Sequence, residues 1–301
     1  MHQLKSIWIA GALLLALGHT SDLFAGQKGA IRVSLDNYDW KKVSGEHFFV
    51  YYTDDDKFAK NVLDKAEKYY VRIAQGLGYP RYSGFWTWDN RVPIYIFADH
   101  KAFIQATDQP EWSHGMADYT HKQIVSYAWG EGFVESLLPH EMAHLIFRDF
   151  VGFKGEIPLW LDEGVAQWAE ESKREYMSQT AMEYYKEDKL LSIEDMMKLD
   201  IRLLKDMDRI YIRATKTREG KMAALFLDVE SLVKTYYLES VAMINFMIDR
   251  FGAKRFTQFC RELRDGKKLE EALQSAYPNK MKNLDEFEER WREYLEEKLS
   301  S

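Results

Sequence analysis

His140-Glu141-Met142-Ala143-His144 is the most informative motif of the chain, together with Glu163, which lies nineteen residues after His144. Residues four apart lie on the same face of an α-helix, so His140 and His144 can turn their imidazoles toward one point. A catalytic zinc site takes three protein ligands and keeps one position open. One helical turn therefore supplies two of the three ligands.

Glu141 is rotated by about 100° from His140 around such a helix, so it would lie beside the metal. Zinc lowers the pKa of a bound water from about 15.7 to near 7, and a neighbouring carboxylate can then take its proton. After attack on a peptide carbonyl, the same carboxyl group can deliver the proton to the leaving amine. Glu141 is the predicted general base.

Glu163 lies in a second stretch whose apolar residues recur at helical spacing. A turn that contains Gly152, Gly155 and Pro158 separates this helix from the first. With this spacing the second helix can pack against the first and present Glu163 as the third ligand. The apolar residues concerned are Leu159, Trp160, Val165, Ala166 and Trp168.

The pattern resembles the gluzincin metallopeptidases, the family that includes thermolysin-like enzymes and zinc aminopeptidases. In that family the His-Glu-x-x-His helix is followed by a glutamate in a Glu-Gly-x-Ala context, and Glu163-Gly164-Val165-Ala166 matches it position by position. The resemblance implies one zinc ion per chain bound by His140, His144 and Glu163, with Glu141 as the base.

Tyr237-Leu238-Glu239-Ser240 is similar to the Tyr-x-x-Gly element that carries the transition-state tyrosine in the aminopeptidase branch, with Ser240 where that branch has glycine. A phenolic hydroxyl can donate to the oxyanion that forms during peptide hydrolysis. Tyr237 is therefore the second predicted catalytic residue, and Tyr236 is the alternative. Most tyrosines in a chain with eighteen of them should simply pack.

The segment from Gln123 to Trp129 is predicted to be a strand. In gluzincins a sheet-edge strand beside the cleft pairs with the substrate backbone, and the resemblance implies that this strand is the substrate-side edge strand. The preceding Gly115-Met116-Ala117-Asp118-Tyr119 does not reproduce the Gly-x-Met-Glu-Asn signature of aminopeptidases, which lends a glutamate to the substrate N-terminus. An endopeptidase is therefore favoured over an aminopeptidase.

Four further polar residues have two interpretations each. A metal-bound histidine usually donates its other ring N–H to an acceptor such as a carboxylate. Glu170 and Asp162 either lie next to the metal ligands in a role of this kind or are solvated helix residues. His114 and His121 are either additional ligands or donors, or packing and surface residues, which is the commoner role of an isolated histidine.

The expected fold class is α+β, with a small mixed α/β N-terminal lobe, a mainly helical second lobe and a zinc-binding cleft between them. Two strands are predicted at His47–Thr53 and Arg91–Phe97, with an amphipathic helix from Phe58 to Tyr70 between them. Residues 26–130 would form the α/β lobe, and residues 131–301 the helical lobe that carries the zinc site and Tyr237. The later helices are expected at Met182–Leu204, Ser240–Phe251, Lys254–Leu263, Leu269–Tyr277 and Leu284–Leu299.

Two residues set helix limits in this scheme. Pro139 either occupies the first turn of the zinc helix, which would then begin near Ser136, or bends that helix. Gly252 is expected to end the helix that carries Ser240.

Residues 1–25 are predicted to be a signal peptide, because Lys5 precedes an apolar stretch from Ile7 to Leu17 that is too short for a comfortable membrane span. Cleavage after Ala25 is preferred, and an uncleaved anchor is the alternative. The single cysteine, Cys260, is expected to be a buried structural thiol. Export without disulfides is typical of a bacterial periplasmic or secreted protein.

The composition and charge of the chain exclude some classes of protein. A chain of 301 residues with 46% hydrophobic and 15% aromatic residues is not a disordered protein. The net charge of −7 is spread in mixed-sign runs, with no basic patch for nucleic acid. No stable membrane span is expected after signal cleavage, and the oligomeric state is left open.

Three functions follow from these observations. The first is a zinc metallopeptidase that acts on peptides or proteins outside the cytoplasm, with all ligands and the base present. The second is a noncatalytic, zinc-stabilised protein that binds a peptide or an envelope partner. The third is a zinc hydrolase of a non-peptide substrate, since the same chemistry attacks other acyl groups.

Overall fold

The computed structural model describes residues 35, 37–79, 86–109, 111, 113–152, 157–204 and 208–300. The chain divides into two compact units, Met1–Ile146 and Phe147–Ser301, and the division falls within helix α4 (Leu138–Val151). The predicted signal peptide lies outside the described residues. No helix among the described residues is long and apolar enough to cross a membrane.

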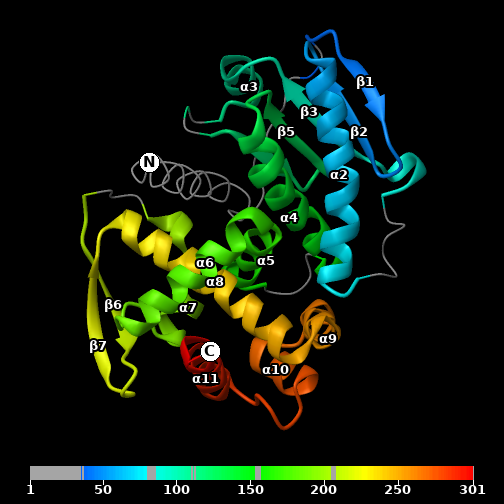
Figure 1. Ribbon diagram of the computed structural model, residues 1–301. Helices are drawn as coiled ribbons and strands as arrows, with labels where there is room; N and C mark the ends of the chain where they lie inside the picture. The colour runs from blue at the N-terminus through cyan, green and yellow to red at the C-terminus, as the bar shows by residue number, and fades with distance from the viewer. Residues whose placement is uncertain are drawn as a thin grey trace. The chain divides into compact units, whose positions relative to one another are not determined.

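The first unit is built on a five-stranded mixed sheet (Figure 1). Its spatial order is β1-β2-β3-β5-β4; β2, β3 and β5 run parallel, and β1 and β4 pair antiparallel with β2 and β5. The predicted strands at 47–53 and 91–97 correspond to β2 and β3. The strands are β1 (Lys41–Ser44), β2 (Phe48–Tyr52), β3 (Val92–Phe97), β4 (Gly115–Asp118) and β5 (Gln123–Tyr127).

The predicted edge strand at 123–129 forms as β5, but its placement at the edge was wrong. β5 pairs on one side with β3 and on the other with β4, so β4 is the terminal strand. Four residues that begin with glycine are too short to show a strand periodicity, yet Met116 and Ala117 pair in register with Val125 and Ile124 and are buried.

Two helices of the first unit pack on the strands. α2 (Asp56–Gly76) contains the predicted helix and begins at Asp55, whose side chain accepts the Phe58 N–H. α2 contacts β1 and β2, and α3 (His100–Thr107) contacts β3 and β5.

Helix α4, which carries His140 and His144, follows directly on a π-helical turn. A π-helical turn, Phe133–Leu137, precedes α4, and the Leu138 N–H donates to the carbonyl of Phe133, five residues back. Pro139 therefore lies in the first turn of α4, where its missing N–H costs nothing. Lys65 and Tyr69 of α2 donate to Glu135 in the π-helical turn and hold this start in place.

The second unit is mainly helical, so the coarse α+β class is confirmed. Its longest helix is α8 (Val229–Phe251), which ends at Gly252 as predicted, with φ 81° at that glycine. The other helices are α5 (Leu159–Ala169), α6 (Glu171–Lys186), α7 (Ile193–Lys198), α9 (Ala253–Arg264), α10 (Leu269–Ala276), α11 (Leu284–Ser300) and the short η4 (Ile201–Leu203).

The single helix predicted from Met182 to Leu204 was wrong. Asp188 adopts the left-handed conformation with φ 55°, and Ser192 caps a new helix by accepting the Asp195 N–H. The apolar residues of this stretch mimic helical spacing, but they belong to the end of α6, to α7 and to η4. Sequence periodicity also missed the hairpin formed by β6 (Tyr211–Lys216) and β7 (Met222–Leu227).

Gly164 lies at a close contact between α5 and α8. A Cβ atom at this position would lie 2.6 Å from the Ser240 carbonyl oxygen and 2.8 Å from Ile244 Cγ1. The helix backbones can approach so closely only because residue 164 has no side chain.

Gly164→Ala is expected to destabilise the protein by about 1–3 kcal/mol, because overpacking outweighs the gain of about 1 kcal/mol in helix propensity. Urea unfolding compared with wild type measures the change. A variant as stable as wild type would show that α5 and α8 can separate at little cost.

Candidate metal centre

The three predicted ligands come together. One ligand atom from each of His140, His144 and Glu163 lies within 4.8 Å of the others. All three side chains are buried, with exposures of 7%, 6% and 2%. It is the one group of this kind among the residues that the structure describes.

The histidine geometry fits a tetrahedral metal site. His140 Nε2 and His144 Nε2 are 3.2 Å apart. Two nitrogens bound to one zinc ion at 2.0–2.1 Å in tetrahedral geometry would be about 3.3 Å apart. Two imidazole nitrogens and one carboxylate oxygen form the donor set of catalytic zinc sites of the His₂Glu type. The residues present therefore fit a zinc ion.

An ion pair joins α4 to α5 beside the ligands. Arg148, one turn beyond His144, donates through Nε and Nη2 to Asp162 Oδ2 at 3.1 and 2.6 Å, and both side chains are about 5% exposed. Asp162 directly precedes Glu163. The alternative in which Asp162 is a solvated helix residue is therefore wrong, because its carboxylate is buried against a guanidinium.

Glu141 follows His140 on α4 and is 4% exposed. Its neighbours along the helix, Met142, Ala143 and Leu145, are buried apolar side chains. These apolar neighbours hold the helix segment around Glu141 within a packed core.

Tyr236 and Tyr237 are both fully buried in α8. Burial, followed by the carboxylates of Glu163 and Asp200, raises the pKa of Tyr236 well above its ordinary value. The Tyr236 hydroxyl therefore stays protonated. The role predicted for Tyr237, and for Tyr236 as its alternative, stays a prediction.

Arg202 is a charged neighbour that sequence inspection missed. It lies in η4, and it binds Asp200 through Nε at 2.6 Å and through Nη2. Burial opposes its charge, yet the Asp200 hydrogen bond and the carboxylates of Asp200 and Glu163 hold its pKa above the ordinary value. The single long helix predicted over 182–204 hid this residue of the short 3-10 helix η4.

Tyr119 is a second residue without a sequence signal. It follows β4, and its ring centroid is 6.3 Å from that of His144 in an edge-on arrangement. Its aromatic ring therefore borders the ligand histidine from the side of the sheet.

The two isolated histidines are engaged elsewhere. His114 Nδ1 lies 2.5 Å from the Tyr127 hydroxyl, and its ring stacks on Trp129. His121 Nδ1 pairs with Asp118 at 2.6 Å. Neither belongs to the metal-ligand group that the described residues form.

Glu170 lies at the C-terminal cap of α5 rather than within the helix. It is buried and pairs with Lys173 at 2.8 Å. Its predicted role next to the ligands stays a prediction. Cys260 is buried, as expected for a structural thiol.

Comparison with models of known protein families found no match, and comparison with curated protein sequences found none either. The functional assignment therefore depends on the residues of the site and on their arrangement.

Arg148→Met is expected to destabilise the protein by about 3–5 kcal/mol, because it leaves the Asp162 carboxylate buried without its cation. Zinc affinity should fall as well, since replacing a residue that orients a metal ligand typically lowers metal affinity by about 10–100-fold. Urea unfolding and competitive zinc titration measure the two effects. The double variant Arg148→Met/Asp162→Leu serves as the control and should recover most of the stability; an unchanged Arg148→Met protein would contradict the role of the pair.

Proposed function

We propose that the protein is a zinc-dependent metallopeptidase of the gluzincin type that hydrolyses peptide bonds. The observation that carries this proposal is the buried group of His140, His144 and Glu163, with Glu141 next to His140 on the same helix. A buried site with two imidazoles and a carboxylate is costly unless a cation neutralises it. Hydrolysis also requires a general base, and Glu141 lies next to His140 on α4.

When bound, zinc would polarise the substrate carbonyl and make water acidic enough to lose a proton near neutral pH. Glu141 would serve as general base toward the attacking water and then as general acid toward the leaving amine. Tyr236 or Tyr237 donates its hydroxyl hydrogen to the oxyanion. Arg148 and Asp162 keep Glu163 oriented, which limits the freedom of the third ligand.

The sheet supports recognition of an extended peptide. β4 is a terminal strand of the sheet, and Tyr119, the residue that directly follows it, lies beside His144. A peptide that pairs with a terminal strand gains main-chain hydrogen bonds without a requirement for a free terminus. An endopeptidase of exported peptides or proteins is the activity that we favour.

Glu141→Gln should keep zinc and lower kcat by about 10²–10⁴-fold, because it removes the general base but no ligand. His140→Ala should lose both zinc and cleavage. The measurement is metal content by mass spectrometry together with cleavage of an unbiased peptide library.

The two variants separate the alternatives. Zinc in wild type without cleavage in any protein would favour a binding protein or a hydrolase of another acyl substrate. Full cleavage by Glu141→Gln would exclude Glu141 as the base.

Tyr236→Phe and Tyr237→Phe form a matched pair for the oxyanion donor. The variant that lacks the true donor should lose about 10²–10³-fold in kcat with zinc affinity unchanged, whereas the other should remain near wild type. Steady-state kinetics on a cleaved library peptide distinguish them. If both variants had the kcat of wild type, neither tyrosine would be the donor to the oxyanion.

A further inference from the structure

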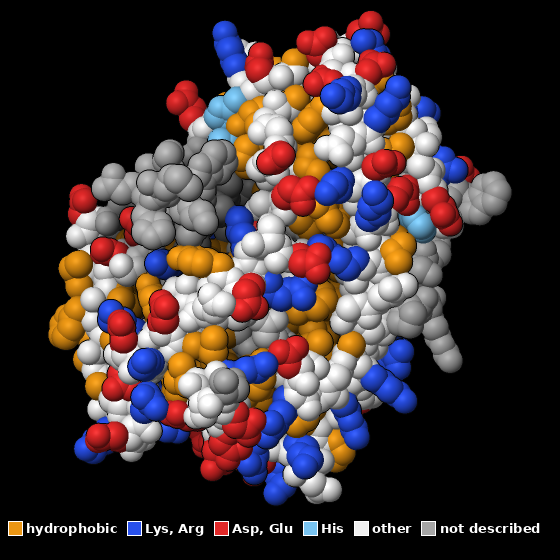
Figure 2. Space-filling view, in the orientation of Figure 1, with side chains coloured by type: hydrophobic (Ala, Val, Ile, Leu, Met, Phe, Trp, Pro, Cys, Tyr) orange, Lys and Arg blue, Asp and Glu red, His pale blue; other side chains and the backbone are white. Residues whose placement is uncertain are grey.

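A cavity of about 210 Å³ lies among helices α6, α8 and α11 of the second unit, and none of the residues that line it is a metal ligand. This volume would hold about seven waters and is smaller than the sites of drug-sized ligands, which take about 300–1,000 Å³. Charged side chains of both signs are spread over the face of the molecule that Figure 2 draws, so charge alone does not mark a binding site. The arrangement of the groups inside the cavity is more specific.

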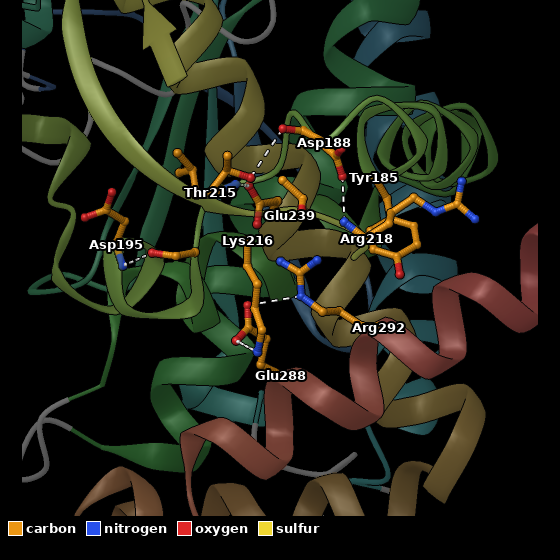
Figure 3. Close-up of polar contacts among 12 residues, drawn as sticks. Tyr185, Asp188, Asp195, Thr215, Lys216, Arg218, Glu239, Glu288 and Arg292 are labelled. Carbon is orange, nitrogen blue, oxygen red and sulfur yellow. Dashed lines mark hydrogen bonds and ion pairs between the residues drawn. The ribbon is translucent and has the colours of Figure 1, made fainter. Parts of the chain in front are cut away.

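The wall formed by α11 is held in place by polar contacts. Glu288 of α11 accepts hydrogen bonds from Lys216 of β6 and from Arg292, each at 3.1 Å (Figure 3). Tyr185 of α6 donates to Glu296 of α11 at 3.1 Å. These contacts fix α11 against α6 and β6, so this wall of the cavity is preformed, as is usual for ligand sites.

Two contacts show how α6 and α8 run past each other. Asn245 Nδ2 donates to Ser178 Oγ at 2.7 Å, and the Lys234 ammonium lies 5.6 Å from the centroid of the Tyr184 ring. The later residue of α6 thus contacts the earlier residue of α8, so the two helices are antiparallel. The hydrogen bond between Asn245 and Ser178 marks the middle of the cavity, because both residues line it.

The cavity is charged at one end and apolar at the other. Arg174 lies one turn before Ser178 on α6, and Asp249 lies one turn after Asn245 on α8, so the two charged side chains share one end. In the opposite direction along the two helices, the next lining residues are apolar. They are Met182 of α6 and Ala242 of α8.

Both charged side chains are positioned by neighbouring groups. The Tyr294 hydroxyl donates to Asp249 Oδ2 at 2.8 Å, and burial, followed by this hydrogen bond, raises the pKa of Tyr294, so the hydroxyl stays the donor. Arg174 Nε donates to the Trp168 carbonyl at 2.8 Å, and its guanidinium lies 4.2 Å from the centroid of the Trp168 ring. Two fixed charges of opposite sign at one end complement a ligand that carries both an ammonium and a carboxylate.

The middle of the cavity offers one acceptor and one donor. Asn245 is only 8% exposed, and its Oδ1 accepts no hydrogen bond from the residues that the structure describes. Ser178 accepts from Asn245, but its hydroxyl hydrogen has no acceptor in the described part of the chain. A buried polar group without a partner is costly, and a polar ligand would satisfy both groups.

We propose that this cavity binds a free α-amino acid with an apolar side chain. The α-ammonium donates to Asp249 and to Asn245 Oδ1. The α-carboxylate lies against Arg174 and accepts the Ser178 hydroxyl hydrogen, and the apolar side chain points to the opposite end. A ligand with a single charge would be attracted by one of the two charged side chains and repelled by the other.

Titration of the protein with L-leucine, followed by ligand-detected NMR, tests the proposal. The dissociation constant is expected on the order of 0.1–1 mM for so small a ligand. Isocaproate lacks only the ammonium of leucine, and isoamylamine lacks only the carboxylate. Each analogue should bind at least about tenfold more weakly than leucine, because it loses a charge-assisted contact.

Two variants assign the charges. Asp249→Asn keeps an acceptor for Tyr294 but removes the negative charge, so the preference for leucine over isocaproate should fall below about threefold. Arg174→Gln should reduce the preference for leucine over isoamylamine in the same way. Asp64→Asn, which changes an exposed aspartate of α2, is the matched control and should keep both preferences of wild type.

Metal-free wild type, prepared with a chelator, separates this cavity from the metal centre, because free amino acids also bind zinc. Leucine should bind the metal-free protein as tightly as the zinc-loaded one, whether or not the protein cleaves peptides. Absence of leucine binding up to about 10 mM, binding that is lost with the metal, or preferences unchanged in both Asp249→Asn and Arg174→Gln would each overturn the proposal.

Discussion

The ion pair of Arg148 with Asp162 is the interaction on which the candidate metal centre depends. α4 carries two ligands within one turn, but Glu163 comes from a separate helix and must be fixed by something other than the chain connection. The guanidinium binds the residue directly before Glu163, in a buried setting where breaking the pair is costly. A second constraint, Gly164, lets α8 approach α5 closely and brings Tyr236 within electrostatic reach of Glu163.

Much of this centre could be predicted from sequence, because helical geometry fixes which side chains share a face. The spacing of His140 and His144 and the context of Glu163 were sufficient to predict that they meet. Residues held by tertiary contacts carried no such signal. Arg202 lies in the short 3-10 helix η4, inside a stretch whose sequence predicted one long α-helix. Tyr119 reaches His144 only because β4 pairs with β5.

Among the helices and strands, too, some could be predicted from sequence and others could not. Long amphipathic elements such as α2, α9 and α11 were predictable from their periodicity. The terminal strand β4 and the β6–β7 hairpin were not: β4 is short, and β7 has neither the alternation nor the polar face of an ordinary surface strand. In each case pairing with a neighbouring strand, rather than local sequence preference, determines the structure.

The central claim is that His140, His144 and Glu163 together hold a zinc ion. X-ray absorption spectroscopy of the zinc-loaded protein tests it most directly. We expect two imidazole nitrogens and oxygen ligands at about 2.0–2.2 Å from the zinc ion, with no sulfur, and the loss of one imidazole in His144→Ala. A sulfur ligand, or a spectrum unchanged in His144→Ala, would contradict it.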